Sequence, residues 1–296
     1  MATGAFAAIR RRHPKSHITL LTTPPYAELA KAAPYFDEVW VDTRPKFWQL
    51  KAVKELVLWL RNGRYKMIYD LQTSGRTNLY FRLLGFHKPL WSGIIDWCSH
   101  PHITPHRTSL HTVDRLKEQM YAACIKNVPK PDISWLKSDI RHFNLPKHYA
   151  ILVPGGSAHR PEKRWTQEGF SKVARFLRDE GITPVLIGTK AEEYELKAIE
   201  KLCEGVINLC GKTSFADIAT LARSAQLAIG NDTGPMHILA VAGAPCIVLF
   251  SRASDPRLCA PRGKQVRIIE EINLNELSHK EVITVVKDVL GLDIKS

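Results

Sequence analysis

Two glycine-containing turns in the second half of the chain carry residue types suited to binding an anion. The first is segment 154–165, PGGSAHRPEKRW, which follows the apolar run 151–153 and contains Lys163. The second is segment 230–237, GNDTGPMH, which lies between the apolar run 227–229 and a stretch of small, helix-compatible residues. The N–H groups of a helix's first turn lack partners inside the helix, and the helix dipole adds positive charge there. We therefore expect the turns to bind a ligand with phosphate and hydroxyl groups, such as a sugar nucleotide.

Each turn also has a purely structural interpretation. Asn231, Asp232 and Thr233 are all good helix caps, and basic residues in a loop are usually solvated. Neither turn matches the GxGxxG or GxxxxGK[ST] pattern of common phosphate-binding loops. Lys163 is the residue best placed to meet a phosphate, and Arg160 and Arg164 are further candidates. The presence of both turns in one chain favours ligand binding more than either turn alone.

The half from Pro154 to Arg262 resembles the nucleotide-sugar domain of glycosyltransferase family 9, the ADP-heptose:lipopolysaccharide heptosyltransferases. Besides the two turns, the matching stretches are 188–192 (GTKAE) and 208–214 (NLCGKTS). A looser resemblance covers the first half through 10–14 (RRRHP), 22–24 (TTP), 36–39 (FDEV) and 70–72 (DLQ). Several motifs in the right order are more specific than any one of them.

The resemblance implies an inverting, metal-independent transfer of a heptose or similar sugar to a lipopolysaccharide core or lipid A acceptor. The donor would be a nucleoside-diphosphate sugar such as ADP-heptose, with no cofactor and no metal, and the chain has no Asp-x-Asp motif. Lys163 would meet the diphosphate, Asp232 the sugar and Glu192 the nucleoside. The alternatives are that Glu192 is only a helix-start charge and His237 only a packed side chain. The implied nucleotide-sugar residues are Ser157, Lys163, Glu192, Thr213, Asp232, Thr233, Gly234 and His237, and Gln72 and Arg76 belong to the acceptor side.

The residues at the start of the chain depart from the family pattern. Segment 2–12 is expected to be a helix with no strand before it, whereas family members open with an apolar strand and a Gly-Asp turn whose Asp is the general base. That strand is normally interior, so its absence would leave ladder groups unpaired on both neighbours. Either Met1 is an internal methionine of a longer reading frame, or the chain is a shortened and catalytically weak variant. The alternative function is that of a truncated remnant that binds nucleotide sugar without turnover. Asp70 is a weak substitute for the base, because capping the next turn explains it better.

Apolar runs and helix-like stretches alternate along the chain, which predicts an α/β fold with parallel sheets. Two Rossmann-like domains facing a central cleft, the GT-B arrangement, fit this alternation, and the resemblance implies the same fold. We expect domains over 1–147 and 148–296, with 127–147 as the linker region and the last helix as a candidate to pack back on the first domain. The expected strands are 17–22, 38–41, 66–71, 90–94, 150–153, 183–187, 206–209, 227–229, 246–250 and 266–269. The main expected helices are 2–12, 25–32, 47–61, 76–84, 111–126, 167–180 and 279–290.

The positive charge is concentrated in the first half of the chain. Residues 1–148 hold 23 Lys and Arg against 11 Asp and Glu, a net +12, whereas residues 149–296 hold 19 against 18, a net +1. This asymmetry indicates an anionic partner for the first half. A phosphorylated glycolipid at a membrane surface fits it, and the alternatives are nucleic acid, for which no motif is present, or a generic solvated surface. No run of eighteen apolar residues occurs and the six cysteines form no CxxC pair, so we expect a cytoplasmic protein, peripheral at the inner face of the inner membrane.

Overall fold

The structure is a computed structural model that describes residues 1–46, 48–85, 88–156 and 159–292. The chain divides into two compact units, Met1–Pro131 (unit 1) and Asp132–Ser296 (unit 2). The division lies within the linker region expected over 127–147, earlier than the expected boundary after residue 147. Each unit is described by itself.

Unit 2 contains one six-stranded parallel sheet in the order β11-β10-β9-β6-β7-β8. Its strands are β6 (Tyr149–Val153), β7 (Thr183–Leu186), β8 (Ile207–Asn208), β9 (Leu227–Asn231), β10 (Cys246–Ser251) and β11 (Val266–Glu271). All five neighbouring pairs are parallel. Apolar side chains fill both faces of such a sheet, which is why these strands read as continuous apolar runs.

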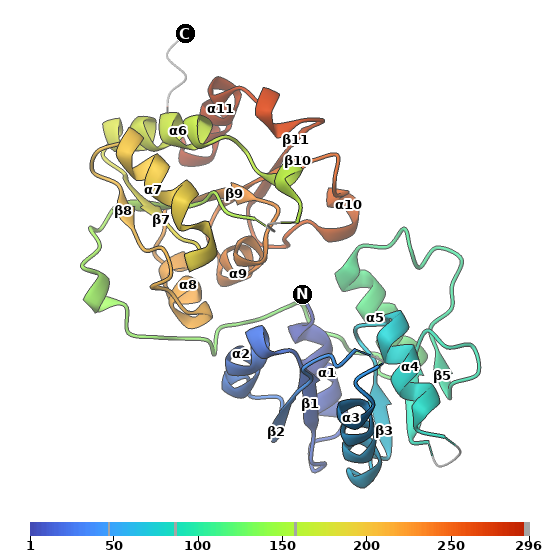
Figure 1. Ribbon diagram of the computed structural model, residues 1–296. Helices are drawn as coiled ribbons and strands as arrows, with labels where there is room; N and C mark the ends of the chain where they lie inside the picture. The colour runs from blue at the N-terminus through green and yellow to red at the C-terminus, as the bar shows by residue number, and fades with distance from the viewer. Residues whose placement is uncertain (47, 86–87, 157–158, 293–296) are drawn as a thin grey trace. The chain divides into compact units, whose positions relative to one another are not determined.

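Helices cover both faces of this sheet (Figure 1). On β6, Ala150 and Leu152 pack into one core, and Ile151 and Val153 pack into the other. The first core lies under α6 (Gln167–Asp179), α7 (Glu193–Leu202) and α11 (His279–Leu290), and the second lies under α8 (Phe215–Ala222) and α9 (Gly234–Ala242). The last helix, α11, thus packs with α6 inside its own unit, and its fully buried Val282 and Val286 hold it there.

Unit 1 contains two separate parallel sheets. One has the order β1-β2 and the other β3-β4-β5. The strands are β1 (Thr19–Thr22), β2 (Glu38–Val41), β3 (Met67–Tyr69), β4 (Leu90–Gly93) and β5 (His100–Pro101). The helices are α1 (Thr3–Arg12), α2 (Ala27–Ala32), α3 (Leu50–Asn62), α4 (Gly75–Leu83) and α5 (Thr112–Ala122). The short strand β5 was not among the expected strands.

Helix α1 packs against a residue of one sheet of unit 1 and against the segment that leads into the other. Its buried residues Ala5, Ala8 and Ile9 form a cluster against which Ile18, just before β1, and Tyr69, at the end of β3, also pack. His13 at the end of α1 lies within hydrogen-bond distance of the Tyr69 hydroxyl, 2.8 Å from Nε2. The described strands of unit 1 form no ladder between the two sheets.

Within the described ranges, no helix has both the length and the apolar character that crossing a bilayer requires.

Candidate functional site

The two glycine-containing turns leave neighbouring strands of unit 2. Strand β6 leads into Gly155, and β9 leads into Asp232, and β6 pairs with β9 in the sheet. From β6 the chain proceeds to β7 and β8 on one side, whereas β9, β10 and β11 lie on the other. The β6–β9 boundary is therefore the topological switch point, where open parallel sheets bind ligands at their carboxyl edge.

Asn231, at the end of β9, ties the two turns together. Its Nδ2 donates to the carbonyl oxygens of Pro154 at 2.8 Å and Gly155 at 3.2 Å. Its Oδ1 accepts from the backbone N–H of Trp165 at 3.0 Å, and its side chain is fully buried. Every polar atom of this amide has a partner, so Asn231 can hold both turns in one geometry without strain.

Lys163 and Asp232 form an ion pair between the two turns. Lys163 lies at the end of a 3-10 turn, η3 (Pro161–Lys163), and its Nζ donates to Asp232 Oδ2 at 2.7 Å. The side chains are only 13% and 8% exposed, so water screens the pair weakly. The hydroxyl of Ser254, in the loop after β10, donates to the same carboxylate oxygen at 2.7 Å.

The amino terminus of α9 has no side-chain cap. Thr233 occupies the N-cap position but makes no capping hydrogen bond, and its Oγ1 is buried with no partner among the described residues. By contrast, Ser74, Thr166, Ser214 and Ser278 each accept a capping hydrogen bond at the start of α4, α6, α8 and α11. The Thr233 side chain therefore caps neither the Gly234 N–H nor the Met236 N–H of this turn, and Pro235 between them has no N–H, so these two groups suit an anion.

Glu192 closes the turn after β7, where it lies against the first glycine turn. It belongs to η4 (Lys190–Glu192), and its Oε2 accepts from the backbone N–H of Thr189 at 2.7 Å and its hydroxyl at 2.8 Å. A Cβ atom at Gly155 would overlap the Glu192 carboxylate. Gly155 therefore lies in close contact with Glu192, whose carboxylate caps the Thr189 turn.

The remaining expected nucleotide-sugar residues follow the same edge of the sheet. Thr213 lies in the turn after β8, whose Gly211 N–H donates to the Gly188 carbonyl at 2.8 Å. Gly234 and His237 lie in the first turn of α9, where Gly234 is exposed and His237 half-buried. Ser157 lies outside the described residues.

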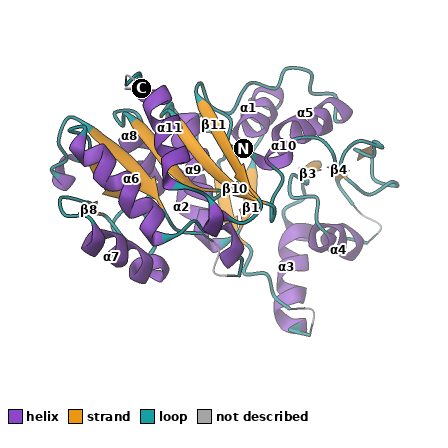
Figure 2. Cartoon of the chain, turned by 90° about the horizontal axis from the view of Figure 1, so that it is seen from above, coloured by secondary structure: helices purple, strands orange, loops and turns teal. Residues whose placement is uncertain are grey.

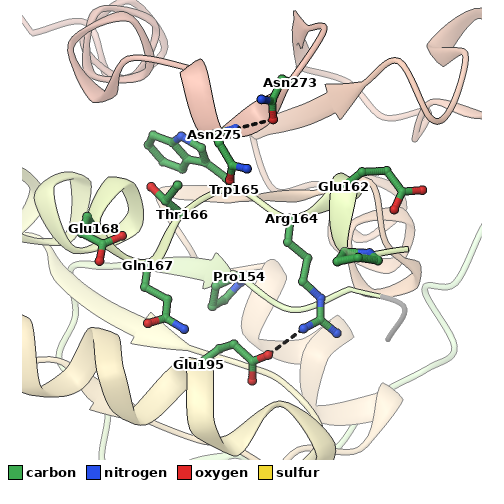
Figure 3. A pocket seen from close by; sticks show the side chains of 11 residues that line it. Pro154, Glu162, Arg164, Trp165, Thr166, Gln167, Glu168, Glu195, Asn273 and Asn275 are labelled. Carbon is green, nitrogen blue, oxygen red and sulfur yellow. Dashed lines mark hydrogen bonds and ion pairs between the residues drawn. The ribbon is translucent and has the colours of Figure 1, made fainter. Parts of the chain in front are cut away.

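Arg164 does not join the Lys163 cluster. Its guanidinium donates to Glu195 Oε1 and to the Gly156 carbonyl oxygen, each at 2.6 Å. It lines a hollow of about 590 Å³ together with Glu195, Gln167 and Asn275, and these side chains point into the same space (Figure 3). Arg164 therefore holds the first glycine turn through Gly156 and pairs with Glu195, apart from the Lys163–Asp232 pair.

The acceptor-side residues of unit 1 lie at the carboxyl end of β3. Asp70 Oδ1 accepts from the backbone N–H groups of Gln72 at 3.2 Å and Thr73 at 2.9 Å, so Asp70 caps this turn, as its context favoured. Burial raises the pKa of Asp70, while these two bonds, the Thr77 hydroxyl and the Arg107 charge oppose the shift. Its second oxygen, Oδ2, is shielded from solvent and has no hydrogen-bond partner among the described residues.

Arg76 lies one turn further along, at the start of α4. It donates to the Pro45 carbonyl at 3.1 Å and lies 3.3 Å from the Tyr80 hydroxyl. It lines an apolar hollow of about 390 Å³, whereas Gln72 is exposed.

The metal-ligating residue types are dispersed. Among the residues that the structure describes, no three His, Cys, Asp or Glu side chains gather in a group able to hold a metal ion.

A family model for glycosyltransferase family 9 (heptosyltransferase) matches residues 53–288. The chain belongs to glycosyltransferase family 9. Curated relatives of this family 9 chain include lipooligosaccharide heptosyltransferase 2 of Haemophilus influenzae, 31% identical over 122 residues that cover 40% of this chain and 35% of the relative. Lipopolysaccharide heptosyltransferase 1 of Escherichia coli K12 is 28% identical over 178 residues, 56% of this chain and 53% of the relative. The matched regions thus span about a third to a half of the relatives' lengths.

Solved structures of family 9 proteins share the fold of the whole chain. A glycosyltransferase of this family from Veillonella parvula has a TM-score of 0.81 at 20% identity, covering 99% of this chain and 93% of that one. The E. coli heptosyltransferase WaaC with ADP has a TM-score of 0.75 at 21% identity, covering 97% and 95%. These comparisons confirm the α/β fold of the GT-B type.

Two residues of this family 9 site were not identified from the sequence. Ser254 follows β10, the neighbour of β9, and the shared carboxyl edge of parallel strands was the only signal that could have pointed to it. Asn231 was placed in the motif, but its structural role was not predicted, because its partners lie 66 to 77 positions away in sequence.

Proposed function

We propose that this family 9 chain transfers a heptose, or a similar sugar, from a nucleoside-diphosphate sugar to a hydroxyl of a lipopolysaccharide core or lipid A acceptor. ADP-heptose is the proposed donor, and the transfer inverts the anomeric centre. Family membership supports the class of reaction, and the geometry of unit 2 supports the donor. The acceptor assignment rests on the family and on the positive charge of the first half.

The ion pair between Lys163 and Asp232, beside the uncapped start of α9, is the observation that carries this proposal. A pyrophosphate bound here would replace Asp232 as the partner of Lys163 and accept hydrogen bonds from the first turn of α9. Asp232, released from the lysine, would accept hydrogen bonds from the sugar hydroxyls. The Thr233 hydroxyl, buried without a partner in the described residues, would gain one from the ligand.

The same groups supply positive charge to the leaving diphosphate without a metal ion. Charge develops on the bridging oxygen as the bond to the sugar breaks, and a fixed lysine and helix terminus stabilise it best in a site shielded from water. Lys163 meets that description, because only 13% of its side chain is exposed. Glu192, held by its own turn, is the proposed contact of the nucleoside, and His237 lies along the diphosphate.

Titration and turnover test the proposal together. Calorimetric titration with ADP and ADP-heptose measures donor binding, and product formation with a heptose-free core acceptor measures transfer. Lys163→Ala should weaken ADP binding by about 10- to 100-fold, since it removes a charge-assisted contact. Lys172→Ala, on the exposed surface of α6, is the matched control and should bind ADP normally.

The outcomes separate the alternatives. Donor binding without transfer would identify a nucleotide-sugar-binding remnant. Absence of any ADP binding would refute the donor site itself. Steeply salt-dependent binding to DNA or RNA, without sugar-nucleotide binding, would replace the proposal with a nucleic-acid function.

A further inference from the structure

Helix α3 of unit 1 carries large apolar side chains on its exposed side. Leu50 is 75% exposed and Leu58 42%, and Trp48, just before the helix, is 60% exposed. Side chains of this kind usually enter the core, as Leu56 on the opposite side of α3 does at 7% exposed. The exposed leucines are therefore not accounted for by the packing of unit 1.

Cations share that side of the helix. Leu50, Lys54, Leu58 and Arg61 follow the spacing i, i+4, i+8 and i+11, which places them on one stripe, and Lys51 lies beside them. The two lysines and Arg61 are all exposed. We name these five residues the α3 stripe.

The charge around the α3 stripe is far above that of the rest of the chain. Residues 44–66 contain seven Lys and Arg against a single Glu, a net +6 out of the +13 of the whole protein. The segment is flanked by an apolar hollow of about 390 Å³, to which Trp48, Leu56 and Leu79 contribute. Helices α3 and α4, which line the hollow, lie side by side (Figures 1 and 2).

We infer that the α3 stripe docks the protein on a lipid bilayer that contains anionic headgroups. Alternating leucine and lysine on one helical stripe suits the boundary between headgroups and acyl chains, where leucines enter the apolar layer and lysines remain at the phosphates. Each cation near an anionic surface contributes to binding.

The exposed leucines of the α3 stripe favour an anionic bilayer over a nucleic acid as the partner. A nucleic acid would use the cations and stack its bases on Trp48, but it gains little from exposed aliphatic side chains. A bilayer uses both kinds of residue. The inference does not depend on the proposed sugar transfer, since it concerns only the surface of unit 1.

Sedimentation of the full-length protein with vesicles tests the inference. Vesicles of phosphatidylcholine with about 30% phosphatidylglycerol should bind the protein, and vesicles of phosphatidylcholine alone should bind it much less. The double variant Leu50→Ser, Leu58→Ser should bind the anionic vesicles about tenfold more weakly. The double variant Lys51→Glu, Lys54→Glu should lose at least about 20-fold.

Two controls keep the result decisive. Tyr194→Ser, Leu202→Ser in unit 2 removes apolar side chains that are 80% and 40% exposed and should bind like the wild type. Circular dichroism and ADP titration verify that each variant is folded. Failure to bind anionic vesicles, or equal binding by the leucine variant, would overturn the inference. Binding to single-stranded DNA that survives the leucine change, without vesicle binding, would assign the surface to nucleic acid.

Discussion

Lys163 Nζ and Asp232 Oδ2 lie 2.7 Å apart, although 69 positions separate them in sequence. The contact joins η3 to the turn after β9 and leaves both charges largely shielded from water. In the protein without ligand, the positive charge of Lys163 is thus already balanced by the Asp232 carboxylate. A ligand phosphate must compete with Asp232, so donor binding and rearrangement of this pair are coupled.

Breaking this ion pair should cost stability as well as affinity. Lys163→Met leaves the Asp232 carboxylate with the Ser254 hydroxyl as its hydrogen-bond partner in the described part of the chain. Loss of one member of a buried pair destabilises a fold by about 3 kcal/mol. The double variant Lys163→Met, Asp232→Asn removes both charges and should recover most of that free energy of unfolding while ADP affinity stays low. Urea unfolding and ADP titration measure the two effects. If the losses in free energy of unfolding of Lys163→Met and Asp232→Asn simply add up in the double variant, the two side chains are not directly coupled.

The close approach of Gly155 to Glu192 should make Gly155→Ala costly for nucleotide binding. The added methyl group overlaps the Glu192 carboxylate, which must leave its cap on the Thr189 turn. We expect ADP affinity to fall about tenfold, or about 1.4 kcal/mol. Gly75→Ala, where no atom lies within 4 Å of the new methyl group, is the matched control. In the Glu192→Ala background, Gly155→Ala should cost much less, and an undiminished effect there would count against the contact.

Acid should destabilise the fold partly through His102. This residue is 2% exposed, and burial lowers the pKa of its imidazole, with the charges of Arg107 and Arg115 acting in the same direction and Glu118 opposing them. The unfolded chain then binds the proton more readily than the folded one, so stability is lost as the pH falls below about 6.5 and through the folded pKa.

His102→Gln should flatten this part of the pH dependence. The glutamine amide retains a donor for Glu118, whose Oε2 lies 3.3 Å from His102 Nε2. Urea unfolding between pH 7 and pH 5 measures the slope, and His106→Gln, an exposed change in the same loop, is the control. If the free energy of unfolding depends on pH equally in the wild type and in His102→Gln, His102 does not contribute to the acid sensitivity.

Tyr80 should stay protonated in strongly alkaline solution. Burial, together with its hydrogen bond of 2.6 Å to Asp42 Oδ2, raises its pKa to about 12. As the pH is raised to 11, the tyrosinate absorbance of Tyr80→Phe should therefore rise as much as that of the wild type. It should also lower the free energy of unfolding by about 1–3 kcal/mol, since Asp42 is 7% exposed and loses a donor. A variant that gains visibly less tyrosinate absorbance below pH 11 would show that the side chain titrates normally.

The sequence by itself determined the fold class, most secondary structure and the two turns that bear the site. The spacing of its apolar residues located helices such as α11 at residues 279–290. Such spacing and the helix caps depend only on residues close together in the sequence. Local residue types also singled out Lys163 and Asp232, since a cation and short polar side chains beside a helix start suit an anion, and the family resemblance added Thr233.

Only the tertiary structure decided which of these residues meet. The strand order brings β6 beside β9 and β10 beside β9, and that order depends on long-range packing that no local pattern encodes. This strand order brings Lys163 and Ser254 within hydrogen-bond distance of Asp232. Arg164 instead donates to Glu195. The tertiary structure also showed that Asp70 caps the turn after β3 and that burial raises its pKa, because burial of a carboxylate is a property of the folded surroundings.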